Sequence, residues 1–238
     1  MRQINRYIII VVLVMLHAGV RAQSTVTDTS ALKLVMQKVF AHFDSSYQPV
    51  FLTGTMRVID GYDSSQNMPL TSFAMARAGK DFYYKAGARE TYNSNTAYVY
   101  IDHVVKHALI GRPKLVVSPL IGNLDGIAHY LESEQYAVTM TSNGKESTVS
   151  FLNEMHVTCK EYTVVYDKEN FAPKRIFVRL TNLADASNPK ADKRIIFTFG
   201  EWRKEVPAQV FNYTGVLEKI NGSWKGKGSL ANYKLTVL

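Results

Sequence analysis

The sequence has 238 residues, with 28 lysines and arginines against 20 aspartates and glutamates, for a net charge of +8. This excess is too diffuse to indicate the clustered basic face of a nucleic-acid-binding protein. Cys159 is the only cysteine, which excludes an intrachain disulfide and leaves stability to packing. An aromatic content of 11% favours β-structure, since aromatic side chains suit a pleated, half-buried surface.

The amino terminus has the pattern of a secretory signal. Arg2 and Arg6 precede an unbroken apolar run over 7–16, and small or modest residues follow at 20–22. The run is shorter than the ~20 apolar residues of a membrane-spanning helix. We therefore expect a signal peptide over 1–22, whose removal takes away three arginines and no acid and lowers the net charge to +5. The remainder, 23–238, is expected to be one exported domain, periplasmic or secreted, without an amino-terminal lipid anchor.

The first element of this domain is expected to be an amphipathic helix. Its apolar residues recur with a period of 3.6 residues and form one stripe, which consists of Leu32, Val35, Met36, Val39, Phe40 and Phe43. We expect this stripe to lie against an apolar surface.

Short runs rich in aromatic and β-branched residues follow, separated by glycine and asparagine turns. They predict strands over 51–59, 71–77, 82–85, 90–92, 97–102, 105–110, 136–141, 146–152, 162–167, 175–180 and 194–199. The connections are too short for helical crossovers, which predicts antiparallel pairing, and Asn143-Gly144 predicts a two-residue hairpin turn. From about 201, two further strands are expected over 211–220 and 230–238, around a glycine- and lysine-rich loop that carries Trp224.

A second, short helix is expected over 119–131, where Ile121 and Leu124 lie on the apolar side. The predicted fold is therefore mainly β (α+β). It is a single curved antiparallel sheet, a half-barrel of about eleven strands, with the two helices covering its concave face.

No motif indicates catalysis. The sequence has neither a Gly-x-Ser-x-Gly elbow nor a phosphate-binding glycine loop. His103 and His107 are interpreted as one strand with Val104 and Val105, which would separate the histidines by about 13 Å, too far for one metal ion. Cys159 is interpreted as a buried thiol, with an interchain disulfide or a nucleophile as alternatives. We predict no catalytic residue, no metal site and no cofactor, and an enzyme remains an alternative.

The order of elements and the residues around Arg77 resemble the LolA family of periplasmic outer-membrane lipoprotein carriers and the LolA-like fold that it shares with the receptor LolB. Proteins of this family have an amphipathic helix, a glycine-containing strand, a strand that ends in an Arg-Pro-Gly-x-Phe-like turn, and an aromatic strand. The corresponding segments are the helix above, Leu52-Thr-Gly-Thr-Met56 and Ala76-Arg-Ala-Gly-Lys-Asp-Phe-Tyr-Tyr84, and the match extends over roughly 31–200. Ala78 stands in place of the proline. The resemblance implies that Arg77 helps to hold a lid closed or to release cargo.

We therefore expect an exported carrier or chaperone that binds an acyl chain, a lipoprotein or another hydrophobic ligand between sheet and helices. The expected ligand-binding residues are Met36, Phe40, Phe43, Arg77, Phe82, Tyr84, Ile121 and Leu124. Expected partners are a lipid or acylated protein and membrane-anchored donor or acceptor proteins, with transient membrane-surface contact and no nucleic acid. Simple core packing is the alternative for each apolar residue. The alternative function is an envelope interaction module that docks a partner through its C-terminal strands.

Overall fold

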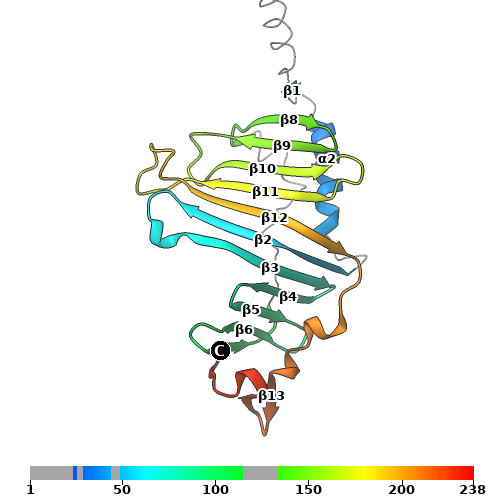
Figure 1. The fold of residues 1–238 in the computed structure, drawn as a ribbon, viewed down its shortest axis with the longest axis vertical. Helices are drawn as coiled ribbons and strands as arrows, with labels where there is room; N and C mark the ends of the chain where they lie inside the picture. Colours follow the sequence, from blue (N-terminus) through cyan, green and yellow to red (C-terminus); the bar gives the residue numbers. More distant parts are fainter. Residues whose placement is uncertain (1–23, 26–28, 44–48, 115–132) are drawn as a thin grey trace, which may run out of the picture.

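The computed structural model describes residues 24–25, 29–43, 49–114 and 133–238 (Figure 1). The predicted signal peptide and the predicted helix over 119–131, with Ile121 and Leu124, lie outside these ranges. Within them, no helix is long and apolar enough to cross a membrane.

Over the described residues the core is one thirteen-stranded sheet, which confirms the mainly β class (Figure 1). The sheet is open, because its two edge strands lie at opposite ends of the molecule; whether it is curved into a half-barrel stays a prediction. In sheet order the strands are β1 (Ser24–Thr25), β8 (Ala137–Asn143), β9 (Glu146–Leu152), β10 (Cys159–Asp167), β11 (Pro173–Leu180), β12 (Lys193–Arg203), β2 (Val50–Asp60), β3 (Met68–Ala78), β4 (Asp81–Ala86), β5 (Arg89–Asn93), β6 (Tyr98–Asp102), β7 (His107–Gly111) and β15 (Lys234–Val237).

The prediction of a purely antiparallel sheet is wrong at one edge, where β15 pairs with β7 in parallel. The chain reaches this edge after a long connection, which consists of the 3₁₀ turns η4 (Ala208–Phe211) and η5 (Tyr213–Gly215), the hairpin of β13 (Leu217–Ile220) and β14 (Ser223–Gly226), and the turn η6 (Gly228–Leu230). A long connection of this kind lets β15 run in the same direction as β7, whereas a tight turn joins antiparallel strands. The predicted strand over 211–220 is therefore strand only from Leu217 to Ile220, with 3₁₀ turns in its first half, and part of the predicted loop around Trp224 is strand β14.

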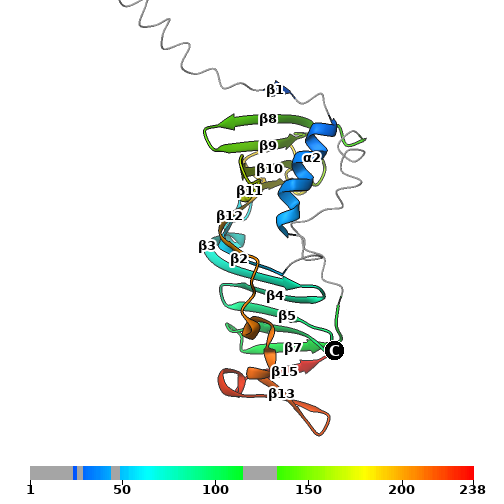
Figure 2. The ribbon, with the colours of Figure 1, turned by 90° about the vertical axis from the view of Figure 1, so that its right-hand side faces the viewer.

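The predicted amphipathic helix is confirmed as α2 (Thr29–Phe40), continued by the 3₁₀ turn η1 (Ala41–Phe43). Figure 2 shows α2 against one face of the sheet. Its stripe and the sheet residues beneath it form one buried cluster, here called the helix-side cluster, which includes Leu32, Met36, Val39, Phe40, Phe43, Val50, Leu52, Phe73, Met75, Phe82, Val149, Phe151, Val164, Ile176 and Phe199. Gly54 on β2 permits this packing, because a Cβ there would lie 2.8 Å from the ring of Phe73 and 2.3 Å from the carbonyl oxygen of Thr198.

A second cluster covers the opposite face of the sheet at its other end. Tyr92, Val99 and Ile110 share one face of β5, β6 and β7, and Tyr83 of β4 lies on that face beside Tyr92. The neighbouring residue Phe82 belongs to the helix-side cluster, so the two clusters lie on opposite faces. The C-terminal segment covers the second cluster, here called the tail-side cluster. This cluster comprises Ala97, Val99, Ile101, Ala108, Ile110, Tyr213, Leu217 and Leu230.

Two local predictions are wrong by a small shift. The hairpin between β8 and β9 turns at Gly144 and Lys145, with Gly144 at φ +59°, because Asn143 pairs with Glu146. Val104 and Val105 lie in the turn between β6 and β7 instead of in a strand, and the side chain of Asp102 accepts hydrogen bonds from both of their amides (2.9 and 3.3 Å). An aspartate that accepts from amides two and three residues further on stabilises a turn.

Candidate ligand-binding groove

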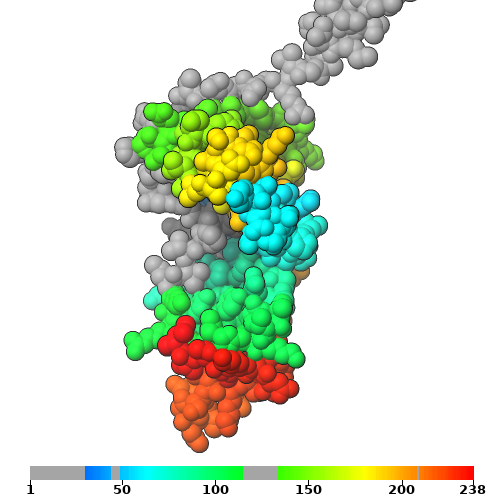
Figure 3. Space-filling view, turned by 90° about the vertical axis from the view of Figure 1, so that its left-hand side faces the viewer, coloured from blue at the N-terminus to red at the C-terminus, as the bar shows by residue number. Residues whose placement is uncertain are grey.

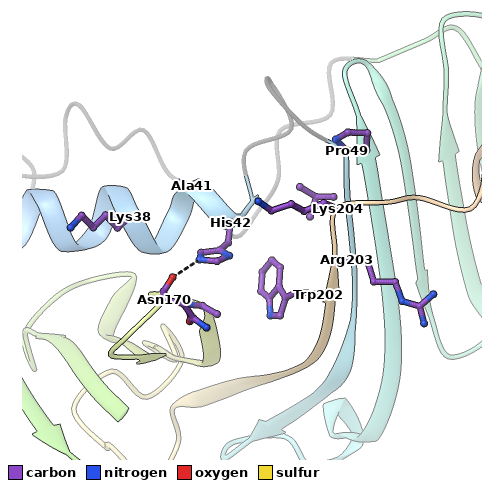
Figure 4. Close-up of a pocket in the computed structure, with 10 residues that line it drawn as sticks. Lys38, Ala41, His42, Pro49, Asn170, Trp202, Arg203 and Lys204 are labelled. Atoms are coloured by element: carbon purple, nitrogen blue, oxygen red, sulfur yellow. Dashed lines mark hydrogen bonds between the residues drawn. The ribbon is translucent and has the colours of Figure 1, made fainter. Parts of the chain in front are cut away.

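A groove of about 530 Å³ lies beside the end of η1, where α2 approaches strand β12 and the loop between β10 and β11 (Figure 4). Its lining combines apolar surface with cationic side chains and consists of Lys38, Ala41, His42, Pro49, Val50, Asn170, Ala172, Trp202, Arg203 and Lys204. This size falls within the range of small-molecule sites.

Trp202 connects the groove with the helix-side cluster. Its indole ring lies 4.9 Å from the ring of Phe43 and 5.4 Å from the ring of Phe199, measured between centroids. The indole N–H donates to the carbonyl of Pro173 at 3.2 Å, which satisfies the polar atom of a half-buried ring. Trp202 therefore presents a fixed apolar surface to the groove.

His42 ties η1 to the neighbouring loop. Its Nε2 lies 3.0 Å from the backbone oxygen of Asn170, and the carbonyl can only accept, so Nε2 carries the hydrogen (Figure 4). The imidazole also meets the indole of Trp202 edge-on, with 5.7 Å between the ring centroids. The two contacts hold one end of the groove in place.

The cations of the groove differ in their partners. Arg203 donates two hydrogen bonds to Glu201 (2.7 and 2.8 Å), which raise the pKa of the guanidinium and lower that of the carboxyl. Its guanidinium points away from His42 and Trp202 (Figure 4). The ammonium of Lys38 lies 4.7 Å from the centre of the Phe171 ring, in a cation–π contact. The groove thus has an apolar wall with cationic groups at its rim.

The structure places the predicted ligand-binding residues of the first helix away from the groove lining. Met36, Phe40 and Phe43 are buried in the helix-side cluster, as is Phe82, while Tyr84 packs against that cluster and is half-buried. Their binding role stays a prediction.

Arg77 lies on the helix side of the sheet. In the pairing of β2, β3 and β4 it stands between Val50 and Phe82, and it shares the face of Phe73 and Met75. Its side chain is half-buried. The expected role in a lid or in release stays a prediction.

Sequence reasoning missed Trp202. Phe199 and Trp202 are three residues apart, which places them on opposite faces of a regular strand. The register of β12 shifts between these two residues, and this bulge returns Trp202 to the face of Phe199. The signal available in the sequence was Gly200 within an aromatic strand.

His103 and His107, the two histidines four residues apart, contact the C-terminal segment. His103 Nδ1 lies 2.8 Å from the hydroxyl of Tyr233, and His107 Nε2 lies 2.8 Å from the hydroxyl of Thr236. Both contacts attach the C-terminal segment to the strands that it covers. Within the described ranges no group of three or more histidine, cysteine or acidic side chains is placed to hold a metal ion.

The sequence matches no family model and no curated protein. Among solved structures, an uncharacterised conserved protein from Thermus thermophilus has a TM-score of 0.44 and 6% identity, over 88% of this chain and 100% of that one. A LolA superfamily protein from Nitrosomonas europaea has a TM-score of 0.34 and 8% identity, over 79% and 100%. A DUF1329 family protein from Desulfovibrio piger has a TM-score of 0.32 and 9% identity, over 79% and 99%.

One of these solved structures is thus a LolA superfamily protein, the superfamily that the sequence resembles. At these TM-scores the likeness is distant and carries no function over to this chain.

Proposed function

We propose that the protein is an exported carrier that binds an acyl chain or another hydrophobic ligand beside α2. The observation that carries the proposal is the groove, because it has an apolar wall in direct contact with the helix-side cluster through Trp202. Each methylene group of an acyl chain that becomes buried against that wall gains about 0.8 kcal/mol by leaving water. The polar end of the ligand lies at the cationic rim, where it stays in contact with solvent.

Native mass spectrometry of protein purified from an exporting host tests whether a ligand is carried. A fluorescent long-chain fatty acid then tests the site. Because Trp202 and Trp224 are the two tryptophans of the chain, Trp224→Phe leaves Trp202 as the reporter, and we expect the probe to quench its emission.

The matched variants are Ala41→Phe, which places an aromatic ring in the groove without adding a tryptophan, and Leu34→Phe, which adds the same ring to an exposed position on α2 outside the groove lining. We expect Ala41→Phe to weaken probe binding and Leu34→Phe to leave it unchanged. Equal binding by both variants, or undiminished quenching of Trp202 in Ala41→Phe, contradicts the proposed site.

The alternative, an envelope module that docks a partner through its C-terminal strands, is favoured by a second groove of about 560 Å³. Tyr213, Trp224 and Lys227 contribute to its lining, and the ammonium of Lys219 lies 5.9 Å from the Trp224 ring. Truncation from 201 is a poor test, because it removes the fully buried Leu217 and Leu230. A partner-binding assay compares Trp224→Ala with Lys225→Ala, an exposed control in the same hairpin. Because both variants keep the buried residues of the segment, loss of binding in Trp224→Ala alone indicates docking and not unfolding.

A further inference from the structure

The charged side chains of the groove beside η1 have one sign. Lys38, Arg203 and Lys204 supply cations, and no aspartate or glutamate is among the lining residues that the structure describes. A cleft lined by charges of one sign concentrates ligands of the opposite sign. The nature of the ligand's polar end therefore depends on which of these cations are available to it.

Arg203 is already occupied. Its two hydrogen bonds to Glu201 neutralise the guanidinium, which also lies over the ring of Phe51, 5.8 Å from the ring centre. These contacts draw the side chain away from His42 and Trp202 (Figure 4). The two lysines remain.

Lys204 has no partner within the chain. It follows the last residue of β12, is exposed, and extends toward η1 (Figure 4). Its ammonium forms no ion pair or hydrogen bond with any residue that the structure describes. An exposed lysine is by itself an ordinary surface residue, and what distinguishes Lys204 is its place at an apolar groove.

Lys38 keeps its charge as well. Its ammonium lies over the ring of Phe171 (4.7 Å), a contact that orients the side chain without neutralising it. The Phe171 ring is held in turn by stacking on Tyr166, with 5.8 Å between the centroids and 10° between the planes. Lys38 thus presents a positive charge at the groove from a fixed support.

We propose that the ligand of this groove is an anionic amphiphile, an acyl chain that ends in a carboxylate or a phosphate. The inference rests on the proposed carrier function and adds the charge of the head group to it. The acyl chain lies against the apolar wall at Trp202, and Lys204 and Lys38 attract the head group at the rim. A cationic head group meets like charges there, and a neutral one gains nothing from them.

Displacement of the fluorescent fatty acid from the Trp224→Phe chain tests the charge of the head group. Dodecanoate and lauroyl-lysophosphatidylglycerol present a carboxylate and a phosphate, whereas dodecanol and dodecyltrimethylammonium present a neutral and a cationic end on a chain of the same length. All four are used below their critical micelle concentrations.

We expect the two anions to bind at least about fivefold more tightly than dodecanol, since one exposed ion pair changes an affinity by up to about fivefold and two lysines act together. Added sodium chloride should reduce this preference, because it screens exposed charges. Tighter binding of dodecanoate indicates a free fatty acid as the source of the anion, and tighter binding of the lysophospholipid indicates a phospholipid.

Lys204→Gln should weaken the binding of dodecanoate about two- to fivefold and leave that of dodecanol unchanged, and Lys204→Glu should weaken the binding of dodecanoate further. The matched control is Lys190→Gln, in the loop 181–192 that precedes β12. Figure 3 faces this edge of the molecule, where the loop 181–192 (yellow) lies next to the loop 61–67 (cyan).

The 11 residues of β12 separate Lys190 from Lys204 by about 30 Å, at ~3.3 Å per residue. Both lysines are exposed, so thermal unfolding of their variants should match that of the original chain. Lys190→Gln should leave the binding of every amphiphile unchanged.

Equal affinity for dodecanoate and dodecanol, with no effect of Lys204→Gln, overturns the inference and leaves carriage intact. A loss of dodecanoate binding that Lys190→Gln reproduces also overturns it, since the net charge of the whole surface would then attract the anion. Failure of the probe and of all four amphiphiles to bind overturns both the inference and the carrier function.

Discussion

The rings of Phe43 and Trp202 meet edge-on, with 4.9 Å between their centroids and 73° between their planes. Phe43 ends the first helical segment, and Trp202 lies near the end of β12, so the contact joins distant parts of the chain. It also links the buried helix-side cluster with the groove. Phe43 therefore supports the groove wall from behind, whether or not it touches a ligand.

Replacing Phe43 with alanine is expected to lower the free energy of unfolding by about 3–5 kcal/mol, because the side chain is fully buried among aromatic rings. Urea unfolding followed by circular dichroism measures the change. Leu34→Ala on the exposed side of the same helix should stay within about 0.5 kcal/mol of the original chain. A near-neutral Phe43→Ala would instead indicate that the ring lines an empty cavity.

Leu230→Ala is expected to cost about 2–5 kcal/mol, since Leu230 is fully buried in the tail-side cluster. The two clusters lie on opposite faces of the sheet, so the effects of Leu230→Ala and Phe43→Ala should add within about 0.5 kcal/mol. The double variant, unfolded in urea beside the two single variants, checks this. A larger departure from additivity would show that the clusters are coupled.

Acid should weaken the ion pair between Glu154, in the loop between β9 and β10, and Arg179 of β11. Hydrogen bonds from Arg179 lower the pKa of this carboxyl below its usual value, against a smaller effect of burial. The pair therefore contributes stability at neutral pH, and the contribution is lost as the pH falls through the lowered pKa. Unfolding measured from pH 7 downward should show a shallower loss for Glu154→Gln than for the original chain, and identical pH profiles would contradict this.

The Cys159 thiol should react slowly with iodoacetamide. Burial raises its pKa, and the thiol donates a hydrogen bond to the carbonyl of Glu161 (3.4 Å), so little thiolate is present near neutral pH. Mass spectrometry over a time course compares the folded chain with the chain in urea, where alkylation should be faster. Equal rates in the two states would show that the thiol is accessible and unperturbed.

Local patterns in the sequence predicted most of the architecture. The helical period from Leu32 to Phe43 and the short runs of aromatic and β-branched residues are patterns among residues close together in the chain. Helix α2 and most strands accordingly lie close to their predicted positions. The strand expected over 230–238 is observed as β15, but its parallel pairing with β7 could not be predicted, because β7 lies far away in the chain. The tail-side cluster was missed for the same reason, since Leu217 and Leu230 are buried only after the C-terminal segment returns.

The groove was less predictable than the fold. The apolar stripe containing Met36 and Phe40 indicated the correct face of the helix, but a stripe does not reveal whether it faces a ligand or a packed sheet. The groove instead depends on the bulge that brings Trp202 to the helix side, and on a loop contact between His42 and Asn170. Both arise from tertiary packing, which neither the two-residue period of a strand nor the 3.6-residue period of a helix reveals.

The change of buried face along the sheet has a mechanical consequence at β4. This strand contributes Phe82 and Ala86 to one cluster, while its Tyr83 packs on Tyr92 at the other face. The amide ladders on either side of β4 are therefore the shared framework of two separately buried cores. We therefore expect the two halves of the molecule to open as separate cooperative units, each with its own rate of amide hydrogen exchange.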